Sequence, residues 1–261
     1  MRPIVRASLA SLPLALALLA SPAAAQIPER FENLQVLPKD IPRDSLVAIM
    51  RAFSGSLGVR CTYCHVQQPG EAGREPRMNF ASDDKPQKNK ARAMMRMTRQ
   101  INTELLPRVP DRVQPPVNVS CLTCHRGLPV PTTLDRVLEA AIDSGGAPAA
   151  IARYRQLREQ TLVSGRYDFS EGTVSDLARR LAARGKTAEA IALLEMNGEF
   201  YPNSGMIDFQ LGEIYRARGD RDRAIAYYRT ALQKQPDNMQ AMRRLDELTG
   251  AAPASPPAPR P

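Results

Sequence analysis

The chain carries two copies of the five-residue motif Cys-x-x-Cys-His, which together use every cysteine and every histidine that it has. The first copy spans residues 61–65 and the second spans residues 121–125. Cysteines three residues apart lie on one face of a helical turn, so both thiols can reach one edge of a porphyrin. The histidine that follows can then bind the iron from beneath the ring.

This motif is the attachment site of c-type haem, so the sequence predicts two covalently bound haem c groups. The expected thioether residues are Cys61, Cys64, Cys121 and Cys124, and the expected proximal iron ligands are His65 and His125. A zinc site made of two Cys-x-x-Cys pairs would not need a histidine after each pair. Two disulfides are a further alternative, but no thioredoxin-like βαβ pattern surrounds the motifs.

The first 25 residues have the pattern of a secretory signal peptide. Arg2 and Arg6 precede an apolar run from Ala7 to Ala20, and small residues come just before Gln26. The apolar run is too short to cross a bilayer comfortably, and an uncleaved anchor is the alternative. We therefore expect cleavage between Ala25 and Gln26 and a soluble, periplasmic mature protein.

The net charge of +9 is concentrated in the part of the chain that holds the two motifs. Residues 26–132 contain 16 basic and 10 acidic residues, whereas residues 171–250 contain 12 of each. A basic domain often indicates nucleic-acid binding, but export argues against it, and we expect no nucleic-acid partner. The basic region is either an ordinary solvated surface or a docking face for an acidic protein or an anionic membrane.

Each haem iron needs a second axial ligand, and no histidine is left to supply one. Methionine is the next usual ligand. Apolar spacing predicts a helix from about Asp44 to Phe53 and another from about Pro86 to Leu106. A methionine on such a helix is more often a core residue than a ligand. The candidates in this region are Met50, Met78, Met94, Met95 and Met97.

Several short segments in this region form a recognisable set. They are Asn33–Pro38, the helix that carries Met50, Leu57–His65, Ala91–Asn102 and Cys121–Gly127. Together they resemble the cytochrome subunit of photosynthetic reaction centres, over about residues 31–131. The resemblance implies that each haem lies on a unit of helix, turn and Cys-x-x-Cys-His helix, with a methionine of the leading helix as the sixth iron ligand.

By position, the resemblance assigns Met50 to the haem of His65 and Met94 to the haem of His125. Met97, one helical turn from Met94, is the alternative at the second haem. Full-length members of the family carry four haems, so the chain resembles half of the duplicated unit. The histidine that binds one haem in the family is absent, and Arg108 falls near that place.

Beyond Pro131 the sequence changes character and acquires an internal repeat with a period of 34 residues. The matching pairs include Leu177 with Leu211, Leu181 with Tyr215, Gly185 with Gly219, Ala190 with Ala224, and Pro202 with Pro236. This pattern resembles the tetratricopeptide repeat, which implies an α-solenoid that binds peptides or proteins. Met239–Leu248 is expected to be a capping helix.

The sequence thus predicts an all-α chain in five parts. These are a signal peptide (1–25), a dihaem cytochrome c domain (26–132), a helical linker (133–170), a tetratricopeptide domain (171–250) and a disordered tail (251–261).

The expected function is electron transfer between redox partner proteins, including membrane-bound partners with an acidic docking face, without enzymatic activity. The repeat domain is expected to dock a protein. The alternatives are a peroxidase-type dihaem enzyme with one open iron site, and an assembly scaffold that uses the repeat domain without redox chemistry.

Overall fold

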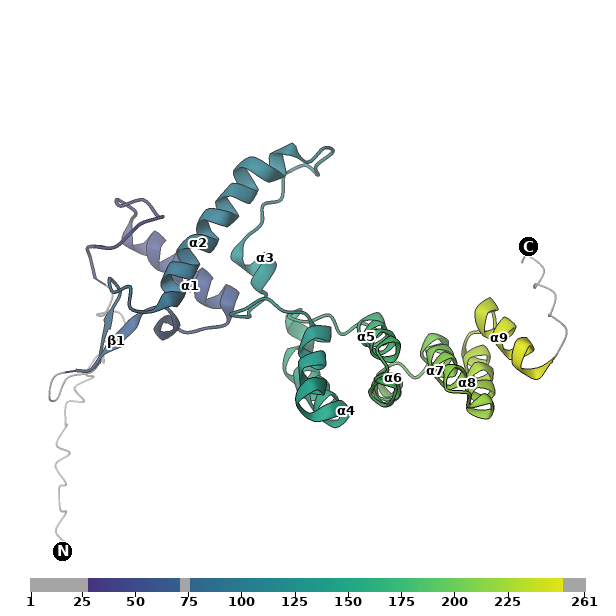
Figure 1. Cartoon of the computed structure of the whole chain (residues 1–261). Coiled ribbons are helices and arrows are strands. Elements are labelled where there is room, and N and C mark those ends of the chain that lie inside the picture. The colour runs from purple at the N-terminus through teal and green to yellow at the C-terminus, as the bar shows by residue number, and fades with distance from the viewer. Residues whose placement is uncertain (1–27, 71–75, 251–261) are drawn as a thin grey trace, which may run out of the picture. The chain divides into compact units, whose positions relative to one another are not determined.

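The computed structural model describes residues 28–70 and 76–250 (Figure 1). The predicted signal peptide and the predicted C-terminal tail lie outside the described residues. The described part is all-α as predicted, apart from one short two-stranded sheet. Two compact units make it up: the first holds the chain up to Ala52 and Arg60–Asn118, and the second holds Phe53–Val59 and the chain from Val119 onward.

The boundary between these units passes through the predicted cytochrome domain. The first motif lies in the first unit, whereas the second motif lies in the second unit with the helical repeats. The domain bounds predicted from sequence stay a prediction.

The first unit consists of short helices around a small hairpin. Its elements are α1 (Arg43–Leu57, whose last five residues belong to the second unit), η2 (Cys61–Tyr63), β1 (Val66–Gln68), β2 (Arg77–Asn79), α2 (Pro86–Gln100), η3 (Ile101–Leu105) and η4 (Leu106–Arg108). Leu46 is the only buried apolar side chain of α1. A protein unit with so few buried apolar side chains depends on something other than an ordinary core for its stability.

Two local features of this unit differ from the sequence-based expectation. The all-α prediction includes no strand after the first motif, but β1 and β2 pair antiparallel, with Val66 opposite Asn79. Strands of three residues are too short to show alternation in a sequence. The second helix was expected to run to Leu106, but α-helical bonding ends at Gln100 and continues as a π-helical turn.

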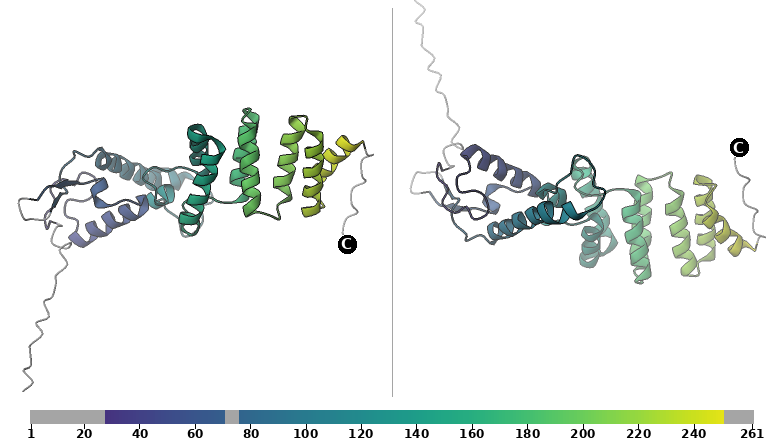
Figure 2. Two further views of the ribbon diagram at one scale, coloured as in Figure 1. Left: turned by 90° about the horizontal axis from the view of Figure 1, so that it is seen from below. Right: turned by 90° about the horizontal axis from the view of Figure 1, so that it is seen from above.

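The second unit begins with the second motif and continues into the helical repeats. Its elements are α3 (Cys121–His125), α4 (Leu134–Thr161), η5 (Leu162–Ser164), α5 (Glu171–Ala183), α6 (Thr187–Phe200), α7 (Gly205–Ala217), α8 (Arg221–Lys234) and α9 (Met239–Thr249). Within α4 the backbone is not helical at Gly145 and Gly146, so this element consists of two helices that meet at a kink. The helices α5 to α8 follow one another as two antiparallel pairs (Figure 2).

The 34-residue repeat matches the burial pattern of the second unit. Leu177, Leu211, Leu181 and Tyr215 are all at most 5% exposed, so both members of these two pairs lie in the core. Gly185 and Gly219 both have positive φ angles, at the turns that end α5 and α7. None of the described helices is both long and apolar enough to cross a membrane.

The packing of α7 against α8 allows no side chain at Gly212. A Cβ atom there would lie 2.6 Å from Cε1 of Tyr228, a fully buried ring. Gly212→Ala is therefore expected to lower the free energy of unfolding of the second unit by about 1–3 kcal/mol, the usual result of overpacking. Gly198→Ala in α6 is the matched control, because its nearest neighbour is 3.9 Å away.

The control substitution should stabilise the helix by about 0.5–1 kcal/mol through backbone entropy. Urea unfolding followed by circular dichroism measures both effects. Equal stability of the two variants would contradict the packing inferred at Gly212.

Candidate haem-binding sites

The first motif follows α1 after a short turn and forms a single helical turn of its own. The backbone N–H groups of Cys64 and His65 both donate to the carbonyl of Cys61, at 3.2 and 3.0 Å. Cys61 is exposed and Cys64 is partly buried, and both are free thiols. Lys85 donates to the carbonyl of Thr62 and so ties the motif to the residue that precedes α2. The two thiols are thus accessible for thioether formation.

His65 lies partly buried against Phe80, with ring centroids 5.0 Å apart in an edge-on arrangement. Burial lowers the pKa of His65 most, and the positive charge of Lys88 lowers it further. A hydrogen-bonding interaction with the Phe80 backbone raises the pKa, and the charge of Arg92 has a smaller lowering effect. The ring is therefore biased towards its neutral form, which is the form that binds iron. Its Nδ1 atom is buried and makes no hydrogen bond.

A charged network lies beside this histidine and fixes the start of α2. Arg92, which is 7% exposed, donates to the carbonyl of Asn33 at 3.2 Å and forms an ion pair with Asp83 at 2.9 Å. Lys88 also pairs with Asp83, at 2.9 Å. The two cations hold the pKa of the Asp83 carboxyl far below its ordinary value. The carboxylate therefore stays charged throughout the physiological range.

The second motif forms the short helix α3, which has polar groups at both ends. At its start, the N–H of Ser120 donates to Oγ1 of Thr123 at 3.0 Å. At its end, Arg126 takes a left-handed conformation, with φ of 49°. This turn brings the carbonyl of Leu128 to 2.8 Å from Nδ1 of His125. Nδ1 must carry the proton to donate to a carbonyl, so Nε2 keeps the lone pair that a metal needs.

The last turn of α1 contacts the second motif directly. The N–H of Gly127 donates to the carbonyl of Ser56 at 2.8 Å. Gly58 has a φ of 65°, and a Cβ atom there would collide with the carbonyl oxygen of Gly127. Only glycine combines this backbone conformation with so close an approach. The glycine after the first helix therefore positions the second haem-binding motif.

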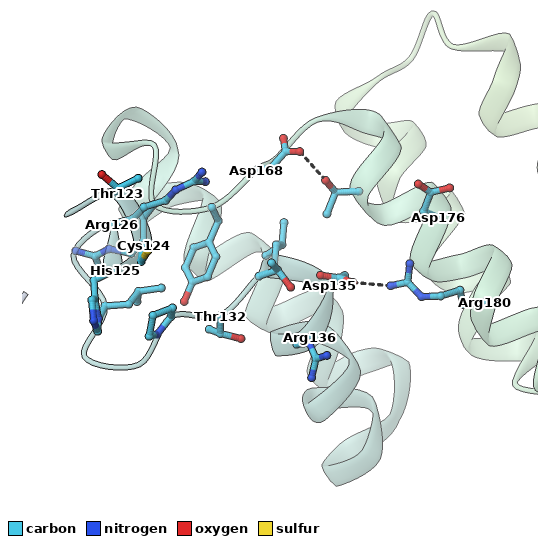
Figure 3. A pocket seen from close by; sticks show the side chains of 17 residues that line it. Thr123, Cys124, His125, Arg126, Thr132, Asp135, Arg136, Asp168, Asp176 and Arg180 are labelled. Atoms are coloured by element: carbon cyan, nitrogen blue, oxygen red, sulfur yellow. Dashed lines mark hydrogen bonds and ion pairs between the residues drawn. The ribbon is translucent and has the colours of Figure 1, made fainter. Parts of the chain in front are cut away.

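A cavity of about 550 Å³ adjoins the second motif within the second unit (Figure 3). Cys124 and His125 lie at one side of it, while Asp135 and Arg180 form an ion pair at 2.6 Å on the other. Segment 166–168, between η5 and α5, also lines the cavity. The surroundings of the second motif are thus partly made by the helical repeats.

The residues present fit covalently attached haem. All four motif cysteines are unpaired, and His125 is held in the tautomer that leaves Nε2 free. Large apolar side chains are exposed in the part of the chain that holds the motifs: Met94, Met97, Leu105 and Leu122 are each between 46% and 55% exposed. Such side chains suit the apolar face of a porphyrin. Among the described residues, no three His, Cys, Asp or Glu side chains gather into a metal-binding cluster.

The candidate distal ligands differ in their exposure and in whether they belong to the same unit as the histidine they are assigned to. Met50 lies on α1, partly buried, in the same unit as His65. Met94 and Met97 lie on α2 in the first unit and are exposed to 46% and 47%, whereas His125 lies in the second unit. Exposure does not rank Met94 above Met97. The assignments of Met50 and Met94 stay predictions.

Sequence reasoning missed three functional contacts in these sites. The carbonyl of Leu128 is a backbone group, so no residue type could have marked it as the partner of His125. Lys88 stands in a stretch of polar residues, where its sequence context is that of a solvated surface lysine. The ring contact between Phe80 and His65 also joins residues 15 positions apart, which no local sequence pattern marks.

Comparison with known proteins supports the resemblance on which these assignments depend. Residues 69–156 match the family described as photosynthetic reaction centre cytochrome C subunit, and residues 209–238 match the tetratricopeptide repeat. The first match contains the second motif and runs into α4, but it begins after the first motif.

Curated relatives include cytochrome c-554 of Chloroflexus aurantiacus, with 36% identity over 97 residues, which are 37% of this chain and 20% of the relative. The photosynthetic reaction center cytochrome c subunit of Rubrivivax gelatinosus is 38% identical over 71 residues, which are 27% of this chain and 15% of the relative. The chain thus spans at most a fifth of these two relatives. A solved structure named MamA AMB-1 is 18% identical, has a TM-score of 0.30 and overlaps 45% of this chain and 63% of its own, which is too little likeness to carry a conclusion.

The sequence-based recognition of both regions is confirmed. Residues 69–156 are related to the cytochrome c subunit of photosynthetic reaction centres, and residues 209–238 form a tetratricopeptide repeat.

Proposed function

We propose that the protein is an exported dihaem c-type cytochrome that carries electrons between redox partner proteins. The single observation that carries this proposal is the pair of Cys-x-x-Cys-His turns, each with two unpaired thiols and a histidine suited to bind iron. The relatives with matching segments are named as cytochromes, which supports the same conclusion. Covalently attached haem supplies a one-electron iron couple.

In this proposal the protein side chains bind and orient the two haem groups and take no part in bond-breaking chemistry. Cys61, Cys64, Cys121 and Cys124 would anchor the two porphyrins, and His65 and His125 would each bind an iron. Met50 and Met94 would supply the second protein ligand of each iron. Iron with two protein ligands cannot bind a substrate without first losing one of them, so the proposed protein is not an enzyme.

The location and partners are further parts of the proposal. The signal-peptide pattern of the first 25 residues supports export to the periplasm. The excess of basic residues over 26–132 suits an acidic face on a redox partner, including one bound to a membrane. The repeats from α5 to α9 suit the docking of a protein or peptide.

The mature chain, produced where c-type maturation operates, is expected to carry two thioether-linked haems. Intact mass spectrometry should show the polypeptide without residues 1–25 plus two haem groups, and acid-acetone extraction should leave the colour with the protein. One added haem, or extraction of the colour, would contradict the proposal.

Peroxide consumption separates the proposed carrier from a peroxidase-type enzyme. We expect both haems to be reduced and reoxidised reversibly, with no sustained turnover of peroxide. Turnover of about 1–1000 per second, the range typical of enzymes, would instead indicate an open iron site.

A further inference from the structure

The two proximal histidines differ in what their Nδ1 atoms contact. Nδ1 of His125 lies 2.8 Å from the carbonyl of Leu128, which is a full hydrogen bond. Nδ1 of His65 is also buried, yet it makes no hydrogen bond. A histidine that donates a strong hydrogen bond becomes a more basic ligand and favours ferric iron. On this ground alone, the iron at His125 should be harder to reduce.

Lys88 binds the backbone group that would otherwise be the partner of the His65 ring, so the two side chains compete for it. The backbone of Phe80 is the main-chain group that interacts with the His65 ring as a hydrogen-bond partner. The carbonyl of Phe80, however, accepts a hydrogen bond from the Lys88 ammonium at 2.9 Å. The same ammonium also binds the carbonyls of Ala81 and Ser82, both at 2.8 Å. Lys88 therefore occupies the Phe80 carbonyl in competition with the histidine and fixes the segment that carries it.

The charges around His65 also favour a higher reduction potential at the first haem. The Lys88 ammonium binds the carbonyl of Phe80, whose ring contacts His65, so a positive charge lies beside the histidine. Arg92 adds a second cation, because it pairs with the same carboxylate as Lys88. Asp83 offsets part of this positive charge, through ion pairs of 2.9 Å with Lys88 and with Arg92. Lys88 and Arg92 are well buried, with side-chain exposures of 11% and 8%, so solvent screens them less than surface charges. A net positive environment disfavours the additional charge of ferric iron.

We propose that Lys88 is a positioning residue that raises the reduction potential of the haem at His65 above that of the haem at His125. This inference rests on the proposed function, because it requires both haems to be present. A single electron on the protein then resides mainly at the first haem. An electron that passed from the second haem to the first would oxidise one ferrous iron and reduce one ferric iron, without moving a proton or breaking a bond.

Two substitutions with opposite expected signs test the proposal on the full-length holoprotein. Lys88→Met removes a positive charge and frees the Phe80 carbonyl, so the potential of the first haem should fall. The ratio of reduced first haem to reduced second haem should fall about tenfold, which is 59 mV for one electron. Asp83→Asn removes the opposing negative charge and keeps the three bonds of Lys88 to carbonyls, so the potential of the first haem should rise. The rise should be the smaller effect, because the Asp83 side chain is 35% exposed.

A redox titration followed by proton NMR reports each haem separately, and contacts between the rings of His65 and Phe80 identify the first haem. Lys90→Met and Asp84→Asn are the matched controls, since both side chains are exposed in the same segments, and neither should shift the haem potentials. Lys88→Arg should recover most of the loss because it retains the charge.

The proposal is overturned if the first haem has the lower potential in the unmodified protein. It is also overturned if Lys88→Met leaves the reduction potential of the first haem unchanged. A shift of that potential in the same direction by Lys88→Met and Asp83→Asn would indicate a purely structural disturbance and would overturn it too. Each of these results is obtained with two haems attached and reversible, so it leaves the proposed function standing. A missing haem would refute the proposed function instead.

Discussion

Replacing Met50 with alanine is expected to remove about half of the methionine-to-ferric-iron charge-transfer absorbance of the oxidised protein. Met50 lies on α1 in the same unit as the first motif, and the resemblance to reaction-centre cytochromes assigns it to the iron at His65. Thioether sulfur favours ferrous iron, so the potential of the first haem should fall as well. Near-infrared absorbance of the ferric protein and a redox titration measure the two effects.

Met94→Ala should remove the other half of the same absorbance. Met94 and Met97 are almost equally exposed on α2, so the two substitutions must be compared directly. Met95→Ala is the matched control on the same helix, because its side chain was not assigned to either iron. If Met94→Ala leaves the band intact and Met97→Ala halves it, Met97 is the ligand of the second haem. If neither Met50→Ala nor Met94→Ala changes the band, the ligand assignment is wrong at both irons.

The sequence predicted the helical parts of the fold well because these depend on periodic burial. The 34-residue repeat placed Leu177 and Leu211 in equivalent buried positions, and both are at most 3% exposed. The break at Gly145 and Gly146 has a local cause in the sequence, because two glycines with a proline soon after disfavour a continuous helix. The hairpin of β1 and β2 was missed because three-residue strands show no period.

The sequence identified the cysteines and histidines of the candidate sites, but not the contacts that surround the two histidines. The two motifs identify the thiols and imidazoles that are predicted to attach a porphyrin, since that chemistry depends on a spacing of a few residues. What distinguishes His65 from His125 is the use of two backbone carbonyls, those of Phe80 and Leu128. Those contacts arise from the turn at Arg126 and from a lysine in the first turn of α2. A pattern of side chains does not record them.

Ending the chain after Pro131 is expected to change the second haem strongly and to spare the first. Leu128 packs against the hydrophobic core that the helical repeats supply. The guanidinium of Arg166 covers Gly127, since its terminal nitrogen lies 3.0 Å from where a Cβ atom of that glycine would be. Truncation removes both contacts, so the turn that holds the Leu128 carbonyl against His125 loses its support.

The expected result is a weaker His125–Leu128 bond and a second haem whose potential rises, while the signals of the first haem keep their positions. The first haem is spared because His65, Phe80 and Lys88 all belong to the first unit. Proton NMR and redox titration of the truncated and full-length proteins make the comparison. Arg166→Ala in the full chain should reproduce part of the change, and Arg229→Ala, an exposed residue of α8, is the control.

Truncation also tests whether the repeats act as a docking module. If both haems keep their potentials in the truncated protein while a redox partner no longer co-purifies, the repeats act in docking alone, and the support inferred at Gly127 and Leu128 is wrong. If the second haem changes and partner binding persists, the repeats serve the second haem site. The contacts of Arg166 with Gly127 and of Leu128 with the core favour a change at the second haem, because they connect the repeats to the turn after His125, the predicted iron ligand.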